Sequence, residues 1–261
     1  MITSSQNPKV KHVRRLLVDR RYRQREKAFV VEGTRWMAEA VASGRQPELV
    51  LATERWLSAQ GNQQYVAGLA AKVTTVGEKV MSVASDTESP AGILAVMPMV
   101  ELPLPNNPTL LLILDRVSDP GNLGTIVRTA AAAGAEGLLL GPGCVDPYNP
   151  KAIRATMGAL LRLPVLSRPW SAIQDLTAGL AVWLTAASGP INYSHVDWRQ
   201  PAALIVGSEA TGVGAEAKAL GSGSISVPMA GRAESLNAAA AAAVVLFEAR
   251  RQRERHLPAG L

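Results

Sequence analysis

Six short apolar runs recur between residues 109 and 229, and stretches with helical character separate them. The runs read TLLLILDRV (109–117), EGLLLGP (136–142), PVLS (164–167), AVWLTAAS (181–188), ALIVGSE (203–209) and SISVPM (224–229). Continuous apolar strands are typical of a sheet buried on both faces, because a strand with one face in water alternates apolar and polar residues. The pattern therefore predicts an α/β fold with a mostly parallel sheet covered on both faces.

A smaller α/β unit is predicted ahead of this sheet. Its expected strands are AFVVEG (28–33), ELVLAT (48–53), KVTTVG (72–77) and GILAVMPM (92–99). The connecting stretch PMVELPLPNNP (98–108) carries four prolines, which disfavour both a helix and a central strand. We therefore expect one domain over residues 1–98 and a second over residues 106–261.

Composition narrows the class of protein further. A single cysteine, Cys144, excludes a disulfide framework, and three histidines without a Cys/His cluster give no metal-site pattern. The longest apolar run, Ala238–Phe247, is much shorter than the roughly 20 residues that cross a bilayer. We expect a cytoplasmic protein with no bound metal and no membrane segment.

Positive charge is concentrated at the start of the chain. Residues 1–30 carry a net charge of +7 and the remaining residues sum to −1. Such a segment is typical of nucleic-acid binding, although a solvated helix face or a basic tail explains the charge equally well. Tyr22, set among the arginines, could stack on a base. The candidate RNA-binding residues are Lys9, Lys11, Arg14, Arg15, Arg20, Arg21 and Arg23, with Lys151 and Arg154 later in the chain.

Polar residues gather where three of the predicted strands end, and ligands of open α/β sheets bind beyond the carboxyl ends of the strands. Asn122 and Arg128 follow the first strand of the second domain, Glu209 follows the ALIV strand, and the quartet 234–237 (ESLN) precedes an alanine-rich helix. The phosphate-binding fingerprints G-x-G-x-x-G and G-x-x-x-x-G-K-[ST] are absent. Ordinary helix capping by Ser235, with Glu234 and Asn237 near the positive helix end, is the competing explanation for the quartet.

These segments together resemble the SpoU/TrmH family of RNA ribose 2′-O-methyltransferases, of the SPOUT class. The similarity lies in NLGTIVRTA (122–130), IVGSEATGVG (205–214) and VPMAGRAESLNAAAAAAVVLFE (227–248), together with DPYNPKAIRATMGALLRLPV (146–165). The first domain resembles the substrate-binding module of many members, in NPKVKHVRRLL (7–17), FVVEG (29–33) and SPAGILAV (89–96).

The resemblance implies a second domain tied in a trefoil knot, S-adenosylmethionine as methyl donor and a homodimer. It assigns Arg128, Asn122, Glu209, Ser235 and Asn237 to the reaction centre. The implied cofactor-binding residues are Thr185, Ala186, Ala187, Gly207, Glu209, Val227, Pro228, Met229, Ser235, Leu236 and Asn237. Arginine stays protonated in proteins, so we expect Arg128 to bind a phosphate or steady a developing alkoxide rather than act as a simple base.

Other interpretations remain open at this point. Glu209 and Arg128 could be an ion pair that braces the sheet, and Lys151, Arg154 and Arg162 could be solvated charges. The chain could be a non-catalytic RNA-binding protein of the same fold, or a nicotinamide-dependent oxidoreductase, which the missing phosphate fingerprint disfavours. We expect ribosomal RNA as the substrate, with transfer RNA as the alternative.

Overall fold

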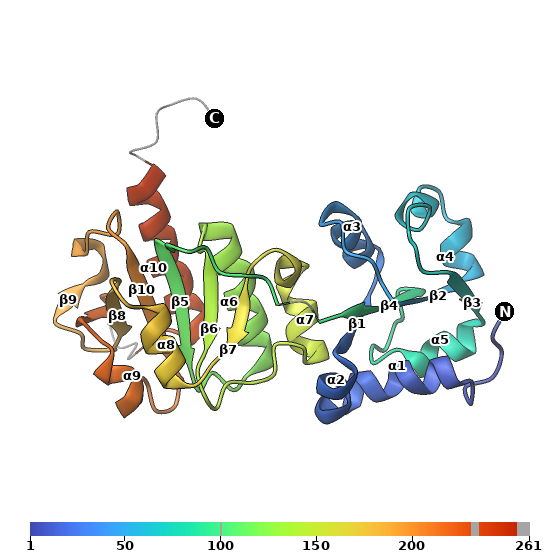
Figure 1. The fold of residues 1–261 in the computed structure, drawn as a ribbon, viewed down its shortest axis with the longest axis horizontal. Helices are drawn as coiled ribbons and strands as arrows, with labels where there is room; N and C mark the ends of the chain where they lie inside the picture. Colours follow the sequence, from blue (N-terminus) through green and yellow to red (C-terminus); the bar gives the residue numbers. More distant parts are fainter. Residues whose placement is uncertain (100, 231–234, 255–261) are drawn as a thin grey trace. The chain divides into compact units, whose positions relative to one another are not determined.

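The computed structural model describes residues 1–99, 101–230 and 235–254, and it forms two compact units (Figure 1). The first unit comprises Met1–Val100 and Tyr148–Leu161, and the second comprises Glu101–Pro147 and Arg162–Leu261. The segment 148–161, which follows the first two strands of the second unit in sequence, therefore belongs to the first unit. None of the described helices is long and apolar enough to span a bilayer.

The first unit is built on a four-stranded mixed sheet in the order β1-β4-β2-β3. β4 is antiparallel to both β1 and β2, and β3 is parallel to β2. Apolar residues of α1 and α5 pack on one face of the sheet, around Leu16, Met81 and Leu94. The elements are α1 (Pro8–Val18), α2 (Arg20–Glu26), β1 (Ala28–Glu32), α3 (Thr34–Ala42), β2 (Leu49–Thr53), α4 (Glu54–Ser58), β3 (Val73–Val76), α5 (Glu78–Ala84), β4 (Ile93–Pro98) and α7 (Pro150–Thr156).

The second unit contains a seven-stranded sheet in the order β7-β6-β5-β10-β8-β11-β9, and every described strand pair is parallel. Its elements are β5 (Leu110–Asp115), α6 (Pro120–Ala133), β6 (Gly137–Leu140), β7 (Val165–Ser167), α8 (Trp170–Leu176), β8 (Ala181–Thr185), β9 (Ile191–Asn192), β10 (Ala202–Gly207), α9 (Ala215–Ala219), β11 (Gly223–Ser226) and α10 (Ala238–Glu254). The prediction of a largely parallel sheet is confirmed.

Helices cover both faces of this sheet, as its apolar strands require. On one face, alternate residues of β5 and β10 pack against Ile173 of α8 and Ala217 of α9. On the other face, α6 and α10 pack against each other, α10 contacts β10 and α6 contacts β6 (Figure 1). All residues of β5 and β10 are buried, so the middle of the sheet is a rigid platform for the loops that follow these strands.

The strand ends place the three sequence motifs at one edge of the second unit. Asp115, the last residue of β5, stands in register with Gly207, the last residue of β10. α6 begins after β5, where the Asp119 side chain caps the helix by accepting a hydrogen bond from the backbone N–H of Asn122 (2.7 Å). Pro120 at the first helical turn favours the same start. Asn122 is thereby fixed in the first turn of α6, beside the end of β10.

Candidate active site

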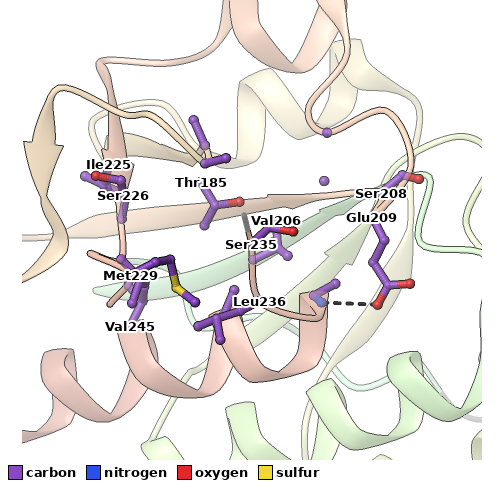
Figure 2. A pocket seen from close by; sticks show the side chains of 17 residues that line it. Thr185, Val206, Ser208, Glu209, Ile225, Ser226, Met229, Ser235, Leu236 and Val245 are labelled. Carbon is purple, nitrogen blue, oxygen red and sulfur yellow. Dashed lines mark hydrogen bonds between the residues drawn. The ribbon is translucent and has the colours of Figure 1, made fainter. Parts of the chain in front are cut away.

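Three residues from the three motifs meet in one hydrogen-bonded group, which we call the amide–carboxylate cluster (Asn122, Glu209 and Asn237). The Asn122 Nδ2 donates to Glu209 Oε1 at 2.8 Å, and the Asn237 Nδ2 donates both to the same oxygen and to Asn122 Oδ1 at 3.1 Å. The backbone N–H of Ala238 adds a third donor to Glu209 Oε1, at 3.2 Å (Figure 2). Residues up to 115 positions apart in the chain therefore converge on one carboxylate.

Asn237 joins this cluster because it is also the N-cap of α10. Its Oδ1 accepts hydrogen bonds from the backbone N–H groups of Ala239 (2.9 Å) and Ala240 (3.3 Å), which leaves its Nδ2 to reach Glu209. The cap expected at Ser235 thus belongs to Asn237, two residues later. Ser235 is exposed and lines a cavity, while Glu234 lies outside the described residues.

A cavity of about 250 Å³ opens beside the cluster, and Figure 2 shows Thr185, Met229 and Leu236 directed into it. Among the predicted cofactor residues, its lining includes Thr185, Ala186, Ala187, Gly207, Glu209, Val227, Met229, Ser235 and Leu236, but not Pro228 or Asn237. The lining also includes Val206, Ser208, Gly212, Ile225, Ser226, Ala238, Ala241 and Val245, which the sequence analysis did not select. The spacing of Ala238, Ala241 and Val245, three and then four residues apart, is the signal that could have identified this face of α10.

Backbone forms much of one wall of this cavity, and a glycine makes that possible. A Cβ atom built on Gly207 would lie 2.3 Å from the carbonyl carbon of Gly212 and 2.5 Å from the N atom of Val213. Any side chain at this position would push the following loop away from the end of β10. The site therefore needs glycine here to keep the loop and its main-chain hydrogen-bonding groups at the cavity.

A smaller hollow of about 110 Å³ adjoins the cavity through shared residues. Ser208, Glu209 and Ala238 line both spaces. The smaller one is otherwise lined by Val117, Ser118, Asp119, Asn122 and Ala210. Glu209 therefore stands between two adjoining hollows, which is the position that a group acting between two bound molecules must occupy.

Arg128 differs from the cluster in its surroundings. It lies in α6 with an exposed side chain, and within the described part of the chain it makes no hydrogen bond or ion pair. The alternative of a bracing Glu209–Arg128 ion pair is wrong, because the described partners of Glu209 are Asn122, Asn237 and Ala238. The guanidinium of Arg128 is instead available to a partner outside the described chain.

The basic residues of the first unit divide into exposed and engaged groups. Lys9, Lys11, Arg14, Arg15, Arg20 and Arg21 are exposed. Arg23 is 4% exposed, and its Nη1 donates to the carbonyl oxygens of Leu16 (2.6 Å) and Leu17 (3.2 Å) at the end of α1. The expectation that Arg23 binds RNA is therefore wrong for this structure. Its side chain satisfies helix carbonyls and cannot reach a phosphate from there.

Two further predicted contacts are already occupied inside the first unit. The Arg15 and Arg25 guanidinium carbons lie 4.3 and 4.7 Å from the centre of the Tyr22 ring, so arginines rather than a base cover this ring. Arg154 is held by both oxygens of Asp86 at 2.8 and 2.7 Å. Lys151 and Arg154 are both exposed on α7. The guanidinium of Arg154 is therefore less available to a phosphate than its charge indicated.

The single thiol has no place in this site. Burial raises the pKa of Cys144 from 9.0 to about 11, and its Sγ lies 3.3 Å from the carbonyl oxygen of Leu114 as a hydrogen-bond donor. A thiol with such a pKa is not a nucleophile at neutral pH.

Comparison with known proteins identifies the family of this chain. The model of the SpoU rRNA Methylase family matches residues 109–247, the region that holds the cluster and both hollows. The chain belongs to the SpoU family. A second family model, the MRM3-like substrate binding domain, matches residues 7–95 of this SpoU member.

Relatives match almost the whole SpoU chain. The 23S rRNA (guanosine(2553)-2′-O)-methyltransferase RlmP of Bacillus subtilis is 35% identical over 255 residues, which are 95% of this chain and 98% of the relative. The SpoU methyltransferase AviRb of Streptomyces viridochromogenes, solved with the cofactor AdoMet, superposes with a TM-score of 0.86 at 28% identity, over 95% of this chain and 100% of that one. An AdoMet-bound rRNA methyltransferase of Sinorhizobium meliloti gives 0.85 at 31% identity, over 98% of each chain. The family resemblance and the two-part α/β architecture predicted from the sequence are confirmed.

Proposed function

We propose that this SpoU protein transfers the methyl group of S-adenosylmethionine to a ribose 2′-hydroxyl of structured RNA, and that the RNA is ribosomal. The observation that carries the proposal is the amide–carboxylate cluster, which draws three motifs together between two adjoining hollows. Two relatives are 23S ribosomal RNA methyltransferases, and this chain matches them over nearly their whole length, which supports this choice of substrate.

The larger hollow fits the methyl donor by its chemistry. Its lining combines apolar side chains such as Val206, Ile225 and Leu236 with the backbone of Gly207 and Ala186, which suits an adenosine bound through main-chain groups. S-adenosylmethionine supplies an electrophilic methyl carried on a sulfonium. We assign Thr185, Ala186, Ala187, Gly207, Val227, Met229, Ser235 and Leu236 to this donor. Pro228, which does not line the cavity, is assigned to the donor by the family resemblance alone.

The smaller hollow is the proposed place of the target ribose. Glu209 Oε1 already accepts three hydrogen bonds, and no described residue donates to Oε2. The free oxygen can accept a hydrogen bond from the 2′-hydroxyl and so direct a lone pair of that oxygen toward the methyl group. Asn122 and Asn237 hold the carboxylate in one orientation, which keeps this direction fixed before substrate binds.

Arg128 acts on charge rather than as a proton acceptor in this proposal. Its guanidinium binds the phosphate next to the target ribose or steadies the developing alkoxide. A bond forms between the 2′-oxygen and the methyl carbon as the methyl–sulfur bond breaks, and the hydroxyl proton leaves along its hydrogen bond to Glu209 Oε2, from which it passes to water. Neutral S-adenosylhomocysteine leaves.

The first unit supplies the proposed RNA contact. Lys11, Arg14, Arg20 and Arg21 are exposed, and within the described residues they have no ion pair that RNA would have to displace. Lys9, Arg15 and Lys151 belong to the same proposal, with Arg154 only if it leaves Asp86. The proposed domain limits, 1–98 and 106–261, are supported by the two family matches, except that Tyr148–Leu161 clusters with the first unit.

Three finer expectations of the family belong to this proposal. A trefoil knot is proposed from the match of residues 109–247 to the SpoU family model. A homodimer is proposed from the family resemblance alone. Cytoplasmic residence is supported by bacterial relatives that modify ribosomal RNA.

The test of the proposed function is Arg128→Lys, assayed with isolated ribosomal RNA and labelled S-adenosylmethionine. We expect turnover to fall on the order of 100-fold or more, because lysine lacks the forked guanidinium, while calorimetric affinity for the donor stays unchanged. Transfer at the wild-type rate would contradict the assignment. Absence of donor binding by the wild-type protein would favour a non-catalytic RNA-binding protein, and ribose methylation found only in transfer RNA would overturn the choice of ribosomal RNA.

A further inference from the structure

The loop after β10, residues 208–214, carries Glu209 and is folded tightly back on itself. The backbone N–H of Gly212 donates to the carbonyl oxygen of Ser208 at 2.8 Å, and the two residues form an isolated antiparallel bridge. Gly212 has a φ of 62°, in the left-handed region that favours glycine. This turn fixes the shape of the loop but does not by itself fix where the loop stands above the sheet.

A buried carboxylate on the neighbouring strand holds the far end of this loop. Asp115, at the end of β5, is 2% exposed, and its Oδ2 accepts a hydrogen bond from the backbone N–H of Gly214 at 2.6 Å. This bond joins residues 99 positions apart in the chain. Because Asp115 is in register with Gly207, both ends of the loop are fixed to adjacent strands.

Arg116 completes the attachment. Its Nε lies 3.3 Å from Asp115 Oδ1, and its Nη2 donates to the carbonyl oxygen of Gly212 at 3.4 Å. Arg116 itself has a φ of 56°, a conformation that is costly for a residue with a side chain. Arg116 begins the loop 116–119, of which Val117, Ser118 and Asp119 line the smaller hollow. Backbone strain of this kind is typical of functional sites, where the surrounding structure holds a residue in one place.

We propose that Asp115 and Arg116 are positioning residues for methyl transfer, because together they set the place of loop 208–214 and hence of the Glu209 carboxylate. Neither residue lines the two hollows, so both act through the loop. This inference rests on the proposed function for its kinetic consequence, whereas the attachment of the loop is a property of the free protein.

Asp115→Asn is the main test, because it keeps the size of the side chain and removes the charge that pairs with Arg116. Turnover falls on the order of 100-fold, as small misplacements of a reacting group do. Gly214→Ala tests the same contact without changing a charge, since its Cβ would lie 2.7 Å from Arg116 Nη2 and 3.2 Å from Asp115 Oδ2. Both variants lose turnover if the attachment of loop 208–214 to Asp115 and Arg116 is what positions Glu209.

Glu136→Gln is the matched control. Glu136 Oε2 accepts a hydrogen bond from the backbone N–H of Leu110 at 3.1 Å, so it braces the opposite end of the same strand, β5. A general loss of sheet stability would affect the control and Asp115→Asn alike. We expect the control to lower Tm and leave turnover per folded molecule unchanged.

Two readouts separate positioning from general stability. Hydrogen exchange of the free protein is faster in peptides covering 208–214 for Asp115→Asn and Gly214→Ala, but not for Glu136→Gln. The loss from Asp115→Asn also nearly disappears in a Glu209→Ala background, because the two residues act through one carboxylate. Unchanged exchange of the loop, or losses that multiply in the double variant, would overturn the inference. The exchange experiment does not depend on the transfer assay. A failure of the proposed function can therefore be distinguished from a failure of the inference about the loop.

Discussion

The two ends of the parallel sheet use their polar side chains in different ways. At the amino end, Glu136 accepts from the backbone N–H of Leu110, and Arg253 donates to the carbonyl oxygens of Thr109 (2.7 Å) and Trp198 (2.8 Å). At the carboxyl end, Asn122 and Asn237 donate to the Glu209 carboxylate. At the amino end these bonds to the main chain hold connections in place and contribute stability. At the carboxyl end, side chains from distant segments also bond to one another and leave one carboxylate oxygen of Glu209 for a ligand.

The largest expected effect at the carboxyl end is on turnover. Glu209→Ala removes the acceptor that Asn122, Asn237 and Ala238 share, so we expect turnover to fall on the order of 100-fold. Because Glu209 is exposed, Tm should change little. The measurements are single-turnover transfer and thermal unfolding. If Glu209→Ala lost stability but kept turnover, the polar side chains at the carboxyl end would contribute stability only, as those at the amino end do.

At the amino end, the expected effect is on stability instead. Arg253→Ala removes hydrogen bonds to Thr109, Trp198 and Gln200 and leaves their carbonyl oxygens without this donor. We expect a loss of about 2 kcal/mol in the free energy of unfolding. Denaturant unfolding measures it, with Arg251→Ala on the exposed face of the same helix as control. Turnover per folded molecule should not change, and a tenfold drop would show that this end also supports the chemistry.

Asn237 contributes to both stability and chemistry, and two substitutions separate the contributions. Asn237→Ala loses the cap of α10, for which we expect about 1 kcal/mol, and also the donor to Glu209. Asn237→Asp keeps a capping oxygen but has no amide to donate, so it should recover stability without recovering turnover. Recovery of turnover by the Asp variant would exclude the amide from the mechanism.

The smallest expected effect concerns the buried thiol beside Leu114. The pKa of Cys144 is about 11 in the folded protein against 9.0 ordinarily, so its contribution to stability is complete below pH 9 and is lost as pH rises toward 11. Linkage gives a loss under about 1 kcal/mol by pH 9.5. Urea unfolding at pH 7.5 and 9.5 measures it, and Cys144→Ala should lack this part of the pH dependence. An equal dependence in that variant would contradict burial as the cause.

The sequence predicted the strands, except the two-residue β9 (Ile191–Asn192), and the convergence of the three motifs. Both depend on patterns that are local or shared by a family, whereas two residues are too few to form an apolar run. Asp115 lies in the first apolar run of the second domain, and the sequence predicts no role for it, because its partner, the N–H of Gly214, is a main-chain group far along the chain. Arg23 was misassigned because charge alone does not reveal that an arginine turns inward to satisfy helix carbonyls. The cap at Asn237 rather than Ser235 depended on the place where α10 begins, which propensity sets only to within a residue or two.

The unequal walls of the larger hollow limit how its preference for a donor can change. On the strand side, a larger residue would displace the main chain, because a Cβ atom on Gly207 would already overlap the backbone of Gly212. On the helix side, Ala241 and Val245 offer replaceable side chains on a regular scaffold. Smaller side chains on α10 are therefore the practical way to enlarge this hollow. Such variants would accept bulkier sulfonium analogues and label RNA with larger alkyl groups.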